Sequence, residues 1–438
     1  MESSDVDLEP PLSFRHGHLF PLVGFGVAAL LSAAVFALRW HQDWNVSEGT
    51  YALTARALLD GGDLYGQLVV AQPPLAFGIG AGVLAVVDSL DALRAAMALL
   101  QLASLAMLAT VAWRISGSRL VAAVLPPLGM LLPWSVHEQG IFSVEAVALP
   151  LLAAAAVLGA RRSGSLCAGA LLAAAIGVKL PMALPAVVTL WFLADRKRGL
   201  FGFAASAAAI AGGSLSTFGS GVIEQAVLAQ LEVGRHDLHY LAELAAQVLW
   251  NMAGLALGLL AVVVAYRNGW RPRDDAQWRV AVAISVGMLL TAGSLLKTGT
   301  SLTVLAPIEA LLLPLAVTGG WLAAQHPGRW SRLAAVVVVA FSVAQSAALL
   351  ASPRTGGHLF SRPGAVAWGI GLTRAETDAQ VAAARRCPAT VAFSGTTTVA
   401  FRAHRRMPGG QPDVFLPSHA QRLKATADAV AADVQRCP

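Results

Sequence analysis

Long apolar runs recur through most of this 438-residue chain, and they limit its fold more than any other feature. Each run approaches the roughly 20 residues that a helix needs to cross a bilayer. Charged residues make up only 13% of the chain, whereas a soluble domain carries roughly 25%. Membrane barrels need short segments of alternating hydrophobicity, which these runs lack. The sequence therefore predicts an α-helical polytopic membrane protein.

The basic residues lie mostly in short loops between the apolar runs, so the net charge of +6 does not point to nucleic acid as a partner. Short loops rich in Lys and Arg face the cytoplasm as a rule. If all of these loops do so, an even number of crossings separates each neighbouring pair. The basic loops are at 114–119, 161–162, 196–198, 267–273 and 329–332.

This rule predicts about eleven transmembrane helices within residues 20–351. Residues 1–19 form an acidic cytoplasmic tail without a cleaved signal peptide, and the C-terminus lies outside. Residues 74–87 are read as a juxtamembrane or re-entrant helix on the outer face, because a crossing there would move Arg114 outside. The predicted spans are 20–40, 92–113, 120–134, 146–159, a hairpin within 164–195, 200–218, 244–266, 278–296, 302–323 and 333–350.

The segment Gly164–Asp195 is about 30 residues long and is interrupted by Lys179-Leu-Pro181. One steeply tilted span would place Arg162 and Arg196 on opposite faces. Two short helices would keep them together, and we favour this hairpin. Lys179 at its tip would then lie below the outer surface, where non-helical backbone must be buried in protein.

Residues 41–90 form the predicted first outer loop. Glu48 follows the first apolar run after a short polar link, and a carboxylate at a membrane face is costly unless it has a partner or a function. The segment Glu48–Leu59 has the pattern of a short amphipathic helix lying along the interface. The alternative is an ordinary solvated loop.

The predicted outer face collects the charges that could carry chemistry. Glu145 and Glu309 are the hardest to explain as plain loop charges, because each lies within apolar sequence. His236 and His239 are read as solvated loop residues. Acids and bases in one outer site suit an anionic head group and a general base. The candidate residues are Asp43, Glu48, Arg56, His137, Glu138, Glu145, Lys179, Arg235, Lys297 and Glu309.

Residues 352–438 differ in composition and predict a small extracytoplasmic α/β domain. Its expected elements are helices at 374–386 and 420–435 and a strand at Thr390–Phe393. An oxidising compartment would favour a disulfide between Cys387 and Cys437, with two free thiols as the alternative. Cys167 lies alone in an apolar run and is read as a small packing residue.

The first outer loop resembles that of polytopic glycosyltransferases of the C superfamily, which include protein O-mannosyltransferases and lipid A aminoarabinose transferases. The resemblance rests on Ser47-Glu48, Tyr51, Gly62-Asp-Leu-Tyr65 and Gln72-Pro73-Pro74. Glu145 matches the family's second-loop acid, Lys179 with Pro181 its hairpin lysine, and KTGTSLTVLAPIEALLLPL its late outer loop. Ser47 stands where the family often has Asp.

The resemblance implies a bacterial plasma-membrane enzyme that transfers a sugar from a polyprenyl-phosphate donor. Glu48 would be the general base, or Asp43 in a shifted register, and Glu145 would assist the acceptor or a metal. Lys179 and Lys297 would neutralise the lipid phosphate. Glu48 and Glu145 could also hold a divalent cation, although no dense ligand motif is present. The alternatives are a non-catalytic lipid carrier or flippase and an assembly subunit that has lost activity.

Overall fold

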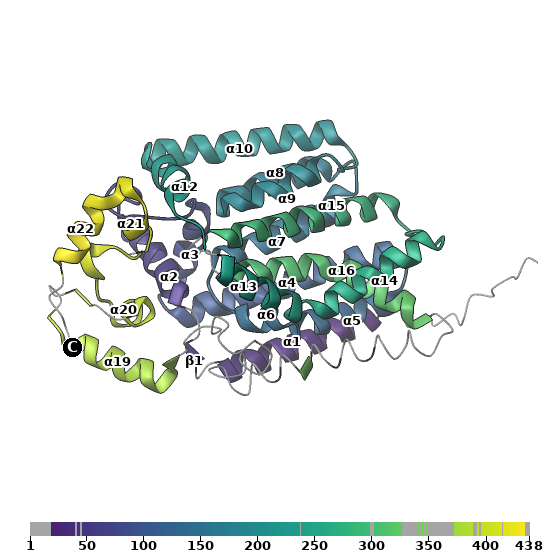
Figure 1. Cartoon of the computed structure of the whole chain (residues 1–438), viewed down its shortest axis with the longest axis horizontal. Helices are drawn as coiled ribbons and strands as arrows, with labels where there is room; N and C mark the ends of the chain where they lie inside the picture. The colour runs from purple at the N-terminus through teal and green to yellow at the C-terminus, as the bar shows by residue number, and fades with distance from the viewer. Residues whose placement is uncertain are drawn as a thin grey trace, which may run out of the picture.

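The computed structural model of the chain is a helical bundle with a cluster of short helices at one end (Figure 1). The structure describes residues 19–39, 42–43, 46–236, 238–297, 302–325, 336, 340, 343–344, 347, 372–388, 392–393, 396–413 and 415–433. Residues 1–18 of the predicted tail lie outside the described residues, and so does most of the predicted span 333–350.

The described helices of the bundle run back and forth between its two ends. Four of them are long and apolar enough to cross a membrane: α4 (Leu90–Ser116), α10 (Arg196–Phe218), the stretch Asp275–Leu296, and α16 (Leu305–Gln325). The other bundle helices are α1 (Leu19–Arg39), α5 (Arg119–Met130), α7 (Val144–Gly159), α8 (Ser165–Val178), α9 (Ala183–Leu190) and α14 (Ala253–Arg267). The prediction of a helical membrane protein with several spans is confirmed, but the predicted number of eleven transmembrane helices is not.

The predicted hairpin at 164–195 is confirmed. Helix α8 ends at Lys179, whose backbone is extended, and the turn η1 (Leu180–Met182) leads into α9. The open ends of the hairpin meet again, because the Asp195 N–H donates to Ser165 Oγ (3.0 Å). Pro181 has no backbone N–H, so the helix cannot run straight through. Lys179 therefore lies at the tip, at the opposite end of the bundle from Arg196.

The described basic loops gather at one end, which we call the basic end, and the loop at 329–332 lies outside the described residues. Arg114 donates to the Val157 carbonyl (2.9 Å), and the Arg273 N–H donates to the Ile115 carbonyl (2.9 Å). These bonds join the C-terminal ends of α4 and α7 and the loop after α14. The opposite end, which we call the polar end, carries the first outer loop and the C-terminal helices (Figure 1).

Two predicted spans are interrupted. The run 120–134 divides into α5 and the short helix α6 (Pro133–Glu138), because Pro133 begins a new helix at the polar end. The run 244–266 divides into α13 (Leu238–Asn251) and α14 at Met252. The stretch Asp275–Leu296 consists of α15 (Asp275–Thr291) and η3 (Ala292–Leu296), and the short connecting elements are α11 (Gly221–Ile223), the π-helix η2 (Glu224–Ala229), α12 (Gln230–Glu232) and η4 (Leu302–Val304).

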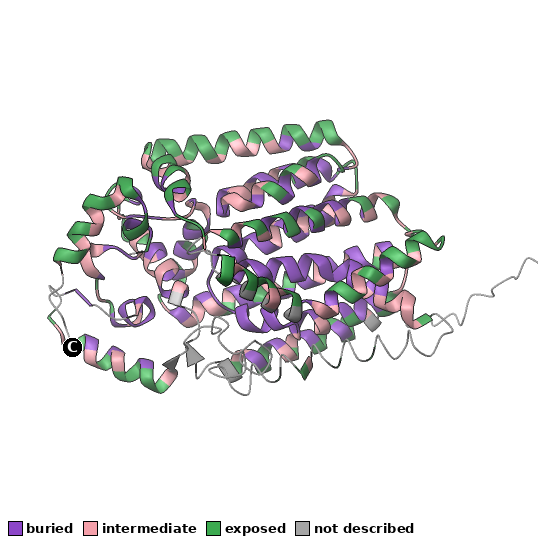
Figure 2. Cartoon of the chain, in the orientation of Figure 1, coloured by how far each residue is buried: buried purple, intermediate pink, exposed green. Residues whose placement is uncertain are grey.

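The core lies among α4, α5, α7 and α16, and α10 covers one side (Figure 2). Most of α10 is exposed, and it packs closely on α8 through glycines. A Cβ added at Gly169 would lie 2.0 Å from the Gly199 carbonyl oxygen. Glycine is therefore required where these two backbones touch.

The short helix predicted in the first outer loop is present as α2 (Val46–Leu59), and α3 (Leu75–Val86) follows it. The chain just before α2 forms β1 (Gln42–Asp43), which pairs antiparallel with β2 (Leu372–Thr373) of the C-terminal segment. Residues 41–90 therefore do not form a plain solvated loop.

The described part of the C-terminal segment is helical apart from β2, so the predicted α/β domain is not confirmed. The helix at Arg374–Arg386 is confirmed as α19. Ala392 and Phe393 form no strand, because Phe393 packs into a small helical core with Val381 and Val399. The remaining elements are α20 (Thr397–Ala403), η5 (Pro408–Gly410), α21 (Phe415–His419), η6 (Gln421–Leu423) and α22 (Lys424–Ala432).

The C-terminal helices pack directly on the first outer loop. A Cβ at Gly49 would lie 2.1 Å from the Thr398 nitrogen, so α2 and α20 are in backbone contact. Phe401 belongs to the main core of the bundle. Cys387 is disulfide-bonded, and its predicted partner Cys437 lies outside the described residues. Cys167 is exposed on α8, so it is not the packing residue that the sequence suggested.

Candidate functional site

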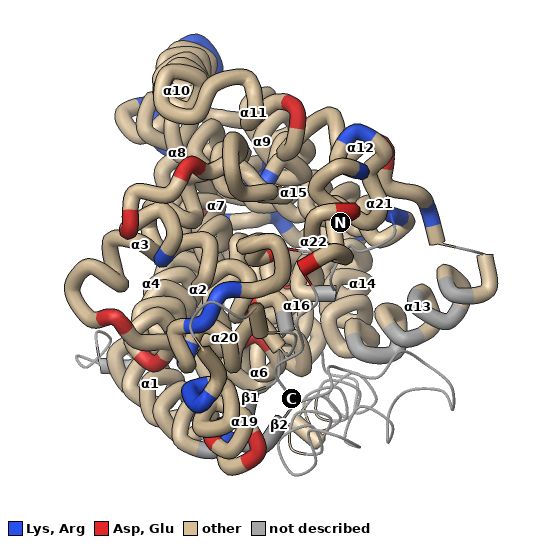
Figure 3. The backbone as a smooth tube through the Cα atoms, turned by 90° about the vertical axis from the view of Figure 1, so that its left-hand side faces the viewer, with Lys and Arg blue, Asp and Glu red and all other residues tan. Residues whose placement is uncertain are grey.

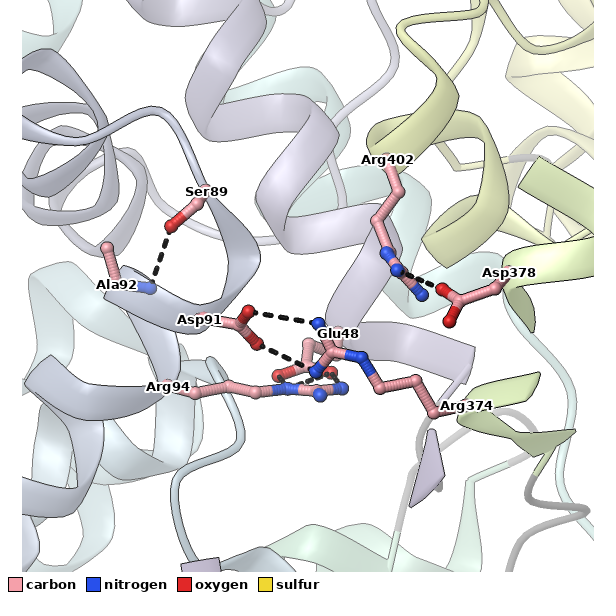
Figure 4. Close-up of polar contacts among 8 residues, drawn as sticks. All are labelled: Glu48, Ser89, Asp91, Ala92, Arg94, Arg374, Asp378 and Arg402. Atoms are coloured by element: carbon pink, nitrogen blue, oxygen red, sulfur yellow. Dashed lines mark hydrogen bonds and ion pairs between the residues drawn. The ribbon is translucent and has the colours of Figure 1, made fainter. Parts of the chain in front are cut away.

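The first buried ion pair at the polar end joins Glu48 of α2 to Arg94 of α4 (Figure 4). Arg94 Nε lies 3.0 Å from Glu48 Oε1, its Nη2 lies 2.5 Å from Oε2, and the Phe142 N–H donates to Oε1 (3.4 Å). Only 1% of the Glu48 side chain is exposed. Arg94 and the Phe142 backbone therefore enclose the Glu48 carboxylate.

A second buried ion pair joins Glu145 to Lys179. Glu145 lies in the first turn of α7, which Ser143 caps, and a helix N-terminus favours a carboxylate. Its Oε1 accepts from Lys179 Nζ and from the Thr303 hydroxyl (2.8 Å). Its Oε2 is buried and has no hydrogen-bond partner among the described residues. Three separate elements thus bring an acid, a cation and a hydroxyl together, with one acceptor unused.

Lys297 lies close to this group. Its Nζ donates to Gln230 Oε1 of α12, and the Gln230 amide donates in turn to the Ala71 carbonyl (3.1 Å). Partial burial, reinforced by the nearby ammonium of Lys179, lowers the pKa of Lys297 to about 8. Two like charges held this close are costly without a counter-anion, so the pair suits a phosphate.

Tyr51 of α2 connects these groups electrostatically. Burial raises the pKa of the Tyr51 hydroxyl, and the carboxylates of Glu145, Asp413 and Glu138 raise it further. The Tyr51 ring also lies 6.1 Å from the Phe77 ring. Side chains from α2, α6, α7 and the C-terminal segment therefore share one neighbourhood, which we call the polar cluster: Tyr51, Glu138, Glu145, Lys179, Lys297, Thr303 and Asp413.

The predicted residues on α6 and α16 form a supporting unit. Glu309 Oε2 accepts from the backbone N–H groups of Trp134 (3.1 Å) and Ser135 (3.3 Å), so it caps the N-terminus of α6. His137 Nδ1 lies 2.6 Å from Glu138 Oε1. Both residues are buried. Glu309 thus holds the short helix that carries His137 and Glu138.

Three other predicted residues lie elsewhere. Arg56 binds Asp88 and the Phe401 carbonyl (2.7 Å) and stacks on the Phe401 ring, so it fastens α2 to α20. Arg235 is exposed and forms a backbone bridge with Lys297. The backbone of Asp43 pairs with Leu372, and its side chain is not described.

The two carboxylates predicted to share a metal bind different cations, Arg94 and Lys179. Among the described residues, no group of three or more His, Cys, Asp or Glu side chains is arranged to hold a metal ion.

Sequence reasoning missed four residues: Arg94, Thr303, Gln230 and Asp413. Arg94 had a usable signal, because a cation two residues inside a predicted span needs a partner. Figure 3 looks onto the polar end and shows how many charges of both signs collect there. Thr303, Gln230 and Asp413 carried no signal, since their placement depends on tertiary contacts.

No family model matches the chain, and no curated protein does. Solved structures do match. One is ArnT from Cupriavidus metallidurans bound to undecaprenyl phosphate, with a TM-score of 0.63 and 14% identity, covering 96% of this chain and 90% of that one. The apo state of the same ArnT matches with a TM-score of 0.57 and 16% identity, covering 88% of this chain and 84% of that one. The chain therefore has the fold of ArnT, a fold that agrees with the resemblance noted in the first outer loop.

Proposed function

We propose that this protein is a glycosyltransferase that transfers a sugar from a polyprenyl-phosphate donor to an acceptor at the outer face of a bacterial plasma membrane. The observation that carries the proposal is the convergence of Lys179 and Lys297 beside Glu145 at the polar end. The solved protein with this fold binds undecaprenyl phosphate. The basic loops lie at the other end, which fits a cytoplasmic basic end and an extracytoplasmic C-terminal segment.

The chemistry follows from the charges. The donor's phosphate leaves when the acceptor oxygen attacks the anomeric carbon, so negative charge grows on the phosphate oxygens. Ammonium groups placed beforehand stabilise that charge at no cost of reorganisation. Lys179 and Lys297 would take this role, and Glu145 would hold Lys179 in position through its hydrogen bond.

Purified protein in nanodiscs, offered a panel of polyprenyl-phosphate sugars and acceptors, tests the proposal. We expect sugar transfer with at least one donor, and we expect Lys179→Ala to weaken donor capture. Free polyprenyl phosphate should compete with the donor. Absence of transfer with every donor would contradict the enzymatic proposal.

A second candidate function is a lipid-binding subunit without transferase activity. It is favoured by Ser47, which stands where the resembled family often has Asp, and by Glu48, whose two oxygens are held by protein donors. This candidate predicts tight binding of polyprenyl phosphate without turnover. Binding and transfer measured on the same preparation separate the two.

A further inference from the structure

The first outer loop does not present a readily accessible carboxylate at its resembled catalytic position. Ser47 has no carboxylate, and Glu48 is buried against Arg94. Transfer to a hydroxyl nevertheless needs a group that takes the acceptor's proton. The group required is a carboxylate of the polar cluster that is less enclosed than Glu48.

Asp413 of the C-terminal segment meets this requirement. It is half-buried, and its Oδ1 accepts from the Phe415 N–H (2.9 Å), which leaves capacity for a further donor. Burial raises the pKa of Asp413, although hydrogen bonds from the Phe415 and Leu416 N–H groups partly lower it. A raised pKa makes a carboxylate a better proton acceptor near neutral pH.

Two contacts fix the chain on either side of Asp413 against the first outer loop. The Gln411 side chain uses both ends of its amide, since Oε1 accepts from the Val69 N–H (2.7 Å) and Nε2 donates to the Gln67 carbonyl (3.0 Å). On the other side, Leu416 packs in a buried cluster with Val69 and Val233. Asp413 is therefore held in a defined place.

The chain beside Asp413 binds the same part of the first outer loop to which Lys297 is tied through Gln230. Gln411 binds at Val69, and two residues later the Ala71 carbonyl accepts from Gln230, which binds Lys297. Asp413 also acts on Tyr51 together with Glu145, the partner of Lys179. The same short stretch of loop thus binds Gln411, two residues before Asp413, and is connected through Gln230 to Lys297.

We propose that Asp413 is the general base of the transfer, supplied by the C-terminal segment in place of the family's first-loop acid. This rests on the proposed function. The acceptor oxygen forms a bond to the anomeric carbon as the bond from that carbon to the phosphate oxygen breaks. The bonding electrons leave with polyprenyl phosphate, and the hydroxyl proton moves to the Asp413 carboxylate.

Other charged groups near Asp413 have partners of their own. Glu232 binds Arg422, and the His419 ring stacks on Phe415. Tyr51, Glu145 and Glu138 are the groups that share its electrostatic neighbourhood. These three are present in every variant below, so a change in the pH profile reports on Asp413.

Asp413→Asn is the decisive variant, because Asn also caps helices and keeps the hydrogen bond to Phe415. We expect kcat to fall about 10²–10⁴-fold with little change in donor KM, and the acidic limb of the pH profile to disappear. Asp413→Glu should recover part of the rate. Asp428→Asn, an exposed position in α22 of the same segment, is the matched control and should behave like wild type.

The outcomes are distinct. Near-normal kcat and an unchanged pH profile in Asp413→Asn, with active wild type, would overturn this role and leave the proposed function intact. Loss of turnover in Glu48→Gln together with normal turnover in Asp413→Asn would show that Glu48, and not Asp413, is the general base. Wild-type protein that transfers no sugar from any donor would overturn both proposals.

Discussion

Each of the two buried ion pairs at the polar end joins a carboxylate to a cation, but the two carboxylates differ in how many of their oxygens accept hydrogen bonds. In the Glu48–Arg94 pair both carboxylate oxygens accept hydrogen bonds, and a backbone N–H adds another. In the Glu145–Lys179 pair one oxygen accepts twice, and the other has no partner among the described residues. The first pair is complete in itself and supports the first outer loop. The second has an unfilled acceptor beside two ammonium groups, as expected of a site that binds a ligand.

The largest effect should come from breaking the complete pair. Arg94→Met leaves Glu48 as a buried carboxylate without its cation, which typically costs about 3–5 kcal/mol. Thermal unfolding in detergent should show a clear loss of stability. Arg198→Met removes an exposed pair with Asp195 at the basic end and should have almost no effect.

A double-mutant cycle sharpens this test. Glu48→Gln/Arg94→Met removes both charges, so its loss of stability should be smaller than the sum of the two single losses. Additive losses would mean that the two side chains do not act as a pair.

The second-largest effect concerns the Glu145–Lys179 pair, in which one carboxylate oxygen has no partner among the described residues. Lys179→Ala should weaken binding of polyprenyl phosphate about 10–100-fold, because a hydrogen bond to a charged group contributes about 1.5–3 kcal/mol. Lys197→Ala, at the exposed basic end, is the matched control. Equal affinities of the two variants for polyprenyl phosphate would show that Lys179 does not bind the lipid phosphate. Glu145→Gln should strengthen binding, since it removes the competing negative charge.

A smaller effect is a pH dependence of lipid binding. With a pKa of about 8, Lys297 is mostly charged at pH 7 and mostly neutral at pH 9. Loss of its proton should therefore lower the affinity for polyprenyl phosphate up to about tenfold over this range. Lys297→Arg stays charged and should abolish the dependence. If the pH dependence persisted in Lys297→Arg, a titrating group other than Lys297 would be its cause.

The smallest effect should come from a pair next to Glu48. Arg374 binds Asp91 at 3.3 Å, and its side chain is 23% exposed, against 11% for Arg94 (Figure 4). Exposed pairs contribute about 0–1 kcal/mol. Arg374→Ala should therefore change the unfolding temperature only slightly. A loss as large as that of Arg94→Met would show that docking of the C-terminal segment depends on this contact.

The sequence predicted the parts of this molecule that local patterns govern. Apolar runs located the bundle helices, Lys179-Leu-Pro181 located the hairpin tip, and the spacing in Glu48–Leu59 located α2. Glu145 and Lys179 were predicted as site residues and do lie together. In each case a charge or a proline stood out against apolar sequence.

The parts that depend on tertiary contacts could not be predicted. Nothing local indicates that Gln411 binds Val69 or that Asp413 lies near Tyr51, since more than 340 residues separate Gln411 from its partner. Glu309 was expected to bind substrate, yet it caps α6, because a free helix N-terminus needs acceptors as much as a ligand needs donors. Of the strand predicted at Thr390–Phe393, only Ala392 and Phe393 are described, and Phe393 packs with helices that lie elsewhere in the sequence.

A structure of the protein with bound polyprenyl phosphate tests the central claim most directly. We predict that the phosphate lies at the polar end, within hydrogen-bonding distance of Lys179 and Lys297, with the Glu48–Arg94 pair unchanged. A phosphate bound to Arg94 in place of Glu48, or among the arginines of the basic end, would contradict this account.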